Sequence, residues 1–149
     1  AHKTVLLSTY RIYNGHEFFR PLAERMQERP ELIVQLFANV ERKSGQTAQE
    51  ALAKFRSDLE HFHWPWERRP QVYYDPRSLA DTGGAILHAK CIVVDDRKAL
   101  ITSANFTEAA SERNIEAGVL TRDRALVQAL AAQFRRLVQD GGLARVAGW

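Results

Sequence analysis

The stretch LHAKCIVVDD, Leu87–Asp96, lies in the middle of the chain. Its apolar run, Cys91–Val94, is typical of a buried strand, yet His88 and Lys90 interrupt its start. Residues two apart on a strand point to the same face. We therefore predict that an imidazole and an ammonium project side by side from a strand that spans residues 86–94.

A second strand, predicted from Ala99 to Ser103, follows a polar turn. If Asp96 and Arg97 form a two-residue turn, antiparallel pairing sets the register of the hairpin. The predicted pairs are Asp95 with Lys98, Lys90 with Ser103, and His88 with Asn105. This register gathers four polar side chains on one face, and a one-residue slip would separate them. Alternatively, these residues only form the solvent-exposed face of a half-buried hairpin. That interpretation does not explain why the face carries hydrogen-bond donors and bases but no acid.

These side chains suit a phosphate group. Lys90 supplies positive charge, while Ser103 and Asn105 supply neutral donors for phosphate oxygens. His88 can act as a nucleophile or as a general acid–base. An imidazole in that role needs a carboxylate to hold its tautomer, and Glu116, at the start of the next predicted strand, is the candidate.

The pattern resembles the signature of the phospholipase D superfamily, His-x-Lys-x4-Asp-x6-Gly-Ser-x-Asn with a downstream Asn-x-Glu. The matching residues are His88, Lys90, Asp95, Ser103, Asn105, Asn114 and Glu116. Thr102 stands where the signature has Gly, and Thr is small enough for a strand. We interpret Asp95 as structural, because the predicted register places it at the hairpin turn.

The resemblance, in particular to compact single-motif nucleases, implies a two-step, metal-independent phosphodiester cleavage without a cofactor. His88 would attack phosphorus and form a phosphohistidine. Lys90 and Asn105 would hold phosphate oxygens with help from Ser103, and Glu116 would orient His88. A second histidine would protonate the leaving oxygen.

The chain contains one such motif, although the mechanism needs two. The other histidines lack a lysine two residues on; they are His2, His16, His61 and His63. A symmetric homodimer with the site across its two-fold axis is the economical solution. A longer native chain is the alternative, which the lack of an initial Met also suggests.

The length of 149 residues suits one domain, and we assign residues 1–149 to a single phospholipase D-like catalytic domain or a fragment of a longer chain. Hydrophobic periodicity predicts an α/β (α+β) fold, a mixed β-sheet flanked by helices on both faces. The resemblance implies that this is the half-unit of the superfamily. The predicted strands span residues 4–9, 32–40, 71–74, 86–94, 99–103 and 115–120, and the predicted helices span residues 16–29, 47–62 and 123–138.

Composition narrows the partners. The net charge of +3 permits a phosphate-bearing partner, and we favour nucleic acid, with DNA ahead of RNA. No apolar run approaches the roughly 20 residues of a membrane span. The single cysteine, Cys91, excludes an internal disulfide and fits the cytoplasm; we expect it to be a small buried apolar residue and not a reactive thiol.

Two further segments have alternative interpretations. In HFHWPWERRP, residues 61–70, the tryptophans dock on the core or stack on nucleic acid, and we favour docking, with Arg68 and Arg69 available to bind substrate phosphate. A metal site at His61 and His63 lacks a third ligand, so no metal is expected. Tyr10 and Arg11, after the first strand, border the active cleft or cap the sheet edge.

The motif does not distinguish nucleic acid from phospholipid. A phospholipase-type lipid hydrolase is one alternative, although no lid or interfacial helix is evident. A non-catalytic nucleic-acid-binding module of a defence or repair complex is another. The phospholipase D-like component of an antiphage defence system is a candidate context.

Overall fold

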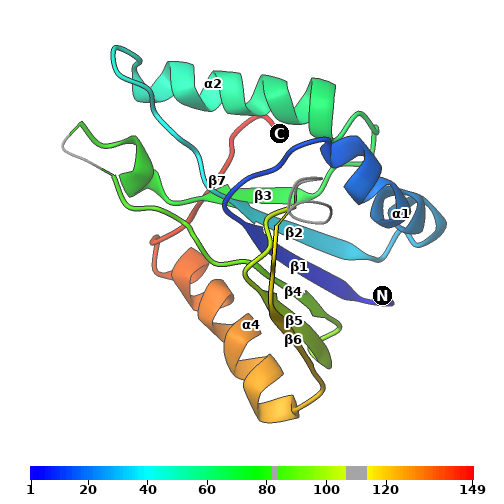
Figure 1. Ribbon diagram of the computed structural model, residues 1–149. Coiled ribbons are helices and arrows are strands. Elements are labelled where there is room, and N and C mark those ends of the chain that lie inside the picture. The colour runs from blue at the N-terminus through cyan, green and yellow to red at the C-terminus, as the bar shows by residue number, and fades with distance from the viewer. Residues whose placement is uncertain (82–83, 107–113) are drawn as a thin grey trace.

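A seven-stranded mixed sheet organises the protein, as the computed structural model shows for residues 1–81, 84–106 and 114–149. The strand order is β6-β5-β4-β1-β2-β3-β7 (Figure 1). The strands are β1 Thr4–Thr9, β2 Ile33–Ala38, β3 Gln71–Tyr74, β4 Cys91–Val94, β5 Lys98–Thr102, β6 Gly118–Thr121 and β7 Ala144–Arg145. The helices are α1 Gly15–Glu28, α2 Ala48–Asp58 and α4 Arg124–Gln139, with a π turn at Leu59–His63 and a 3-10 turn at Pro76–Leu79.

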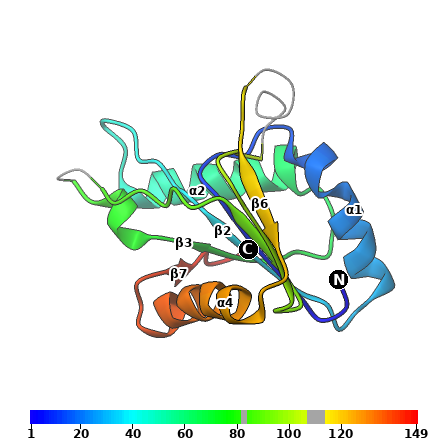
Figure 2. The same cartoon turned by 60° about the horizontal axis from the view of Figure 1, so that its bottom comes forward.

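Helices cover both faces of this sheet. Alternate residues of β1 divide between two cores, because successive side chains of a strand point to opposite faces. Val5 and Leu7 face α1 and the π turn, whereas Leu6 faces α4. Figure 2 shows α4 on one side of the strands and α1 with α2 on the other. The predicted mixed sheet flanked by helices on both faces is confirmed.

Helix ends follow from capping chemistry. Thr47 and Glu50 form a capping box at the start of α2, and the Asp123 side chain accepts from the N–H of Leu126 at the start of α4. The predicted helix over residues 47–62 is therefore correct at its beginning but loses α geometry after Asp58. The short strand β7, which pairs with β3, was not expected from the sequence.

The predicted register of the hairpin is wrong by one residue. Val94 pairs with Lys98 and Cys91 with Ile101, so the turn contains three residues, Asp95–Arg97, instead of two. Lys90 therefore lies opposite Thr102, and the Thr102 N–H donates to the Lys90 carbonyl at 3.0 Å. The strand β4 also begins only at Cys91, so His88 precedes the ladder and is not paired across it.

The reason for the longer turn is the conformation of two aspartates. Asp95 and Asp96 both adopt the left-handed region, at φ 53° and 52°, which aspartate tolerates better than most residues. The Asp95 carboxylate accepts from the backbone N–H groups of residues 2, 3 and 4, at 2.7–3.1 Å. Asp96 pairs with Arg135 of α4 at 2.7 Å. The turn thus ties the start of β1 and one helix to the hairpin.

Asp95 should contribute to stability in a pH-dependent way. Burial raises its pKa, but the three backbone donors outweigh this effect and hold the pKa at about 2. Since an unfolded aspartate has a pKa of about 3.9, the stabilisation is complete above that pH and is lost as the pH falls towards 2. Asp95→Asn should lower the free energy of unfolding at neutral pH by about 1–2 kcal/mol, after allowance for solvent screening.

Denaturant unfolding of both proteins from pH 7 to pH 2 measures this difference, which should shrink below about pH 4. Asp96→Asn is the matched control, with a smaller effect because it removes a surface ion pair. An Asp95→Asn protein that is fully stable but inactive would contradict the structural role.

Candidate active site

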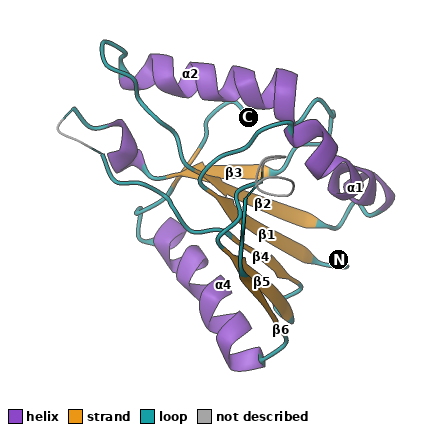
Figure 3. Cartoon of the chain, viewed as in Figure 1, coloured by secondary structure: helices purple, strands orange, loops and turns teal. Residues whose placement is uncertain are grey.

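The motif lies where β1 and β4 meet, next to the carboxyl ends of β1 and β2. In Figure 3 these strands lie at the centre of the sheet, between the helices. Two fully buried hydroxyls at the end of β1 hold the motif segments. Ser8 Oγ donates to the carbonyl of Ala89, between His88 and Lys90, at 3.0 Å. Thr9 Oγ1 accepts from the N–H of Phe106, directly after Asn105, at 3.4 Å.

His88 and Lys90 contact each other directly. The Lys90 ammonium lies 3.0 Å from Nδ1 and 3.2 Å from Nε2 of His88, and it donates to the His88 carbonyl at 2.9 Å. His88 is exposed, whereas Lys90 is 7% exposed. Burial lowers the pKa of Lys90, and the charge of Glu116 partly opposes this effect. A sheltered cation therefore stands beside an imidazole that is open to substrate.

Tyr10 forms a wall beside this pair. Its ring centroid lies 5.0 Å from that of His88, and the Lys90 Nζ lies 5.9 Å from the same centroid. The Tyr10 hydroxyl donates to Glu41 Oε1 at 2.7 Å, and the Arg11 guanidinium lies 5.3 Å from the ring. Of the two interpretations of Tyr10 and Arg11, the structure supports the one in which they border the site.

Ser103 and Glu116 form a second cluster. The Ser103 hydroxyl donates to one Glu116 oxygen, and the Asn114 side-chain amide donates to the other at 3.2 Å. These two hydrogen bonds lower the pKa of Glu116, so the carboxylate stays ionised. Among the described residues, the carboxylate has no hydrogen bond to His88 of the same chain, although its charge acts on Lys90.

Asn105 connects the motif to a side cleft. Its Oδ1 accepts from the Arg11 N–H at 3.3 Å. It also lines a cleft of about 770 Å³ that opens between the ends of β1 and β2 and helix α2. We call this space the side cleft; it is formed by residues 10–13, residues 38–41, Lys43, Gln46, one face of α2, His63 and Asn105.

The two arginines proposed to bind phosphate are not brought to the motif. Arg68 donates to the backbone carbonyls that end α1 and precede β2, including that of Arg29 at 2.9 Å. These groups lie at the opposite end of the parallel strands from Tyr10. Arg69 pairs with Glu60 and lies 4.7 Å from the Trp149 ring. Both guanidinium groups therefore have structural partners, and we do not carry them into the proposed site.

The neighbouring tryptophans and histidines are also structural. Trp64 is buried, and its Nε1 donates to the Arg68 carbonyl at 2.8 Å, which is the expected docking on the core. His63 Nδ1 accepts from the Gly15 N–H at 3.3 Å, and burial lowers the pKa of His63. Within the described ranges, no three His, Cys, Asp or Glu side chains gather as metal ligands would.

Ser8 and Thr9 contact the motif segments and Glu41 contacts Tyr10, and none of these three residues was predicted from the sequence. Two hydroxyl residues at the end of an otherwise apolar strand were a usable signal, because buried hydroxyls need hydrogen-bond partners. The position of Glu41 carried no signal. Cys91 is buried as expected, and burial raises the pKa of its thiol to about 11. No helix in the described part of the chain is long and apolar enough to cross a membrane.

Solved structures with the same fold include NucT, Nuc and a phosphatidylserine synthase. NucT from Helicobacter pylori aligns with a TM-score of 0.65 at 17% identity, over 93% of this chain and 80% of that one. Nuc from Salmonella typhimurium, a phospholipase D family member, aligns at 0.62 and 16%, over 97% and 82%. Phosphatidylserine synthase from Haemophilus influenzae Rd KW20 aligns at 0.59 and 16%, over 96% and 33%.

Family membership comes from the sequence itself. No curated protein sequence matches this chain at a significant level. The family model described as "Cardiolipin synthase, PLD-like domain" matches residues 1–138, which includes every residue of the motif. The expected phospholipase D resemblance is confirmed, and the chain belongs to the family of phospholipase D-like domains.

Proposed function

We propose that this protein is a metal-independent phosphodiesterase, a nuclease that acts through a phosphohistidine at His88. The observation that carries the proposal is the contact between the exposed His88 ring and the sheltered Lys90 ammonium. A phosphate oxygen carries charge and is a better acceptor than an imidazole nitrogen. An arriving diester would draw the ammonium to itself and leave the ring free to attack.

The proposed hydrolysis of the phosphodiester has two steps. A His88 ring nitrogen forms a bond to phosphorus, and the bond to the leaving oxygen breaks as a second histidine protonates that oxygen. Water then attacks the phosphohistidine, gives its proton to the second histidine and releases a phosphomonoester. Lys90, Asn105 and Ser103 supply charge and donors to the phosphate oxygens.

We propose that the second histidine comes from another copy of the chain. In the chain itself, His16 bonds to the Phe62 carbonyl, His61 to the Ser57 carbonyl and His63 to the Gly15 N–H. None of these three shares a hydrogen bond or ring contact with His88 among the described residues. A homodimer that places two copies of His88 face to face supplies both roles from one sequence.

The exposed edge of the sheet offers the surface for this dimer. β6 ends the sheet, and its Val119 and Leu120 are 62% and 64% exposed. Ile86, Ile101 and Ile115, close to the motif, are also exposed. Unpaired edge strands and exposed apolar side chains are both typical of interfaces. Burial of this surface against its own copy would bring the two motifs together.

A shared site also gives Glu116 a role. Within one chain its oxygens accept from Ser103 and Asn114 rather than from His88. A carboxylate can accept more than two hydrogen bonds. We propose that Glu116 orients a His88 ring once the dimer has formed, with Asn114 holding the carboxylate in place.

Nucleic acid, DNA before RNA, is the proposed substrate. The net charge of +3 and the isoelectric point near 9.2 favour a polyanion. A lipid hydrolase and a non-catalytic binding module are the other candidates. The cytoplasmic location and the antiphage context stay predictions.

The first functional test is cleavage of labelled single- and double-stranded DNA, RNA and phosphatidylcholine in excess EDTA. DNA cleavage should persist, because Lys90 and neutral donors meet the phosphate charge. His88→Ala should slow it at least about a thousandfold. His61→Ala is the control and should retain the wild-type rate. Loss on chelation with rescue by added metal would contradict the mechanism.

The second test is the pH profile of kcat/KM. Because burial lowers the pKa of Lys90, the rate should fall on the alkaline side at a pH below the ordinary lysine value of about 10.4. Lys90→Arg keeps its charge to higher pH, so this slower variant should lack the part of the alkaline fall that Lys90 causes, whereas any fall caused by the second histidine should remain in both proteins. The same fall in both proteins would show that another group titrates.

A further inference from the structure

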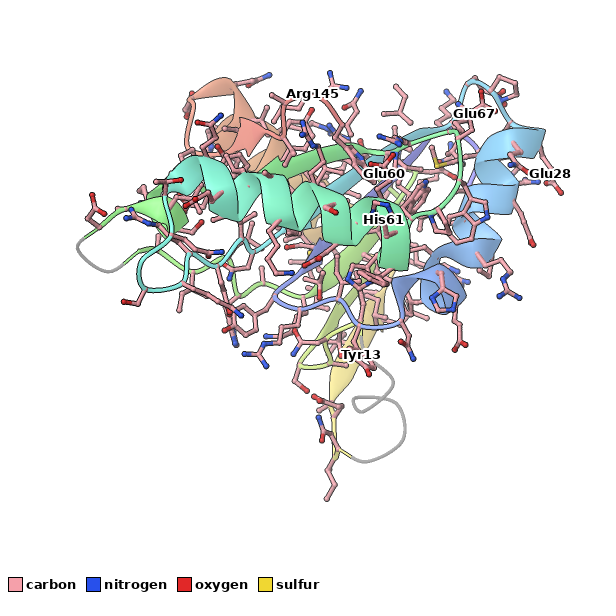
Figure 4. The ribbon with its side chains drawn as sticks, turned by 90° about the horizontal axis from the view of Figure 1, so that it is seen from above. Tyr13, Glu28, Glu60, His61, Glu67 and Arg145 are labelled. Carbon is pink, nitrogen blue, oxygen red and sulfur yellow. The ribbon has the colours of Figure 1, made fainter. Side chains whose placement is uncertain are left out.

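The side cleft continues from the motif. Tyr10 and Asn105 connect the motif to the cleft. Tyr10 packs on His88, Asn105 is a motif residue, and both side chains line the cleft. Figure 4 shows Tyr13 at the side of the molecule where β6 projects, while Glu28 marks the far end of α1. A chain attached to a phosphate at His88 would pass Tyr10 and enter this space.

The lining is aromatic and rich in amides. Tyr10, Tyr13 and Phe55 contribute rings, and Asn39, Gln46 and Asn105 contribute amide groups; all six line the cleft. Rings suit an aromatic ligand. The three amide oxygens accept from backbone N–H groups, so the amide NH2 groups are left to donate to the ligand's edge. A nucleobase has both features.

The charges of the cleft are largely paired. Lys54 forms an ion pair with Asp58 at 2.6 Å, and Arg11 lies 3.9 Å from Glu41. Lys43 is exposed, and its ammonium has no acidic partner among the described residues. Because most of its positive charges are paired with carboxylates, the cleft is a poor site for a chain of phosphate groups. It suits a neutral base whose backbone phosphate lies at the mouth, within reach of Lys43.

The volume decides which form of nucleic acid fits. About 770 Å³ is within the range of pockets that hold a single small ligand. A paired base is stacked inside the duplex and reaches a pocket only after it leaves the stack. A base in a single strand enters without that cost.

We propose that the side cleft binds the unpaired nucleoside next to the scissile phosphate, so that the protein selects single-stranded nucleic acid. The inference rests on the proposed nuclease function but concerns recognition rather than chemistry. Tyr13 supplies the exposed ring that stacks on the base, and Lys43 meets the flanking phosphate.

Fluorescence anisotropy with His88→Ala protein tests binding without cleavage. The probes are a short labelled single strand, its duplex, and single strands with one abasic position each. We expect binding to the single strand at least about tenfold tighter than to the duplex, and an abasic residue at one position to weaken binding roughly tenfold.

A second substitution identifies the cleft. Tyr13→Ala, made in the His88→Ala protein, should weaken binding of the intact strand roughly tenfold but add little for the sensitive abasic strand, since the same contact is already lost. Phe62→Ala is the matched control, because Phe62 is as exposed as Tyr13, at 62% against 61%, but does not line the cleft.

Equal binding of strand and duplex, no sensitive abasic position, or equal effects of the Tyr13 and Phe62 changes would overturn the proposal. Tighter binding to vesicles of anionic phospholipid than to any strand would also overturn it. Failure of the nuclease function is distinguishable, since wild-type protein would then bind the strand in this pattern without cleaving it.

Discussion

Two buried hydroxyls at the end of β1 hold the proposed site together. Ser8 binds the carbonyl between His88 and Lys90, and Thr9 binds the backbone directly after Asn105. Both hydroxyls are fully buried, where an unpaired polar group costs about 1–3 kcal/mol, so these bonds are strongly favoured. The two halves of the motif, which lie on different segments, therefore meet at one strand end.

The spacing of the motif was readable from the sequence, but its geometry was not. The sheet, its flanking helices and the turn position of Asp95 followed from hydrophobic periodicity and the motif. The hairpin register did not, because two aspartates in the left-handed region lengthen the turn by one residue. The two motif segments are nevertheless both tied to the end of β1, by the hydroxyls of Ser8 and Thr9.

The contacts of the two arginines were not predictable from the sequence either. Arg68 and Arg69 looked available in the sequence, but the carbonyls at the end of α1 and the Glu60 carboxylate occupy them. Long-range contacts of this kind leave no local signal. The proposed site lies at one end of β1 and β2, where the motif, the Tyr10 wall and the side cleft adjoin. The apolar edge strand is the surface through which, in the proposed dimer, a second copy would complete the site.

In the proposed dimer, two copies of His88 work in one shared site. Wild-type and His88→Ala subunits, mixed and allowed to exchange, measure this through activity against mixing fraction, with mass from light scattering. If heterodimers cannot finish the cycle, a dimeric species should show activity that falls as the square of the wild-type fraction. An active monomer, with activity linear in that fraction, would contradict the account.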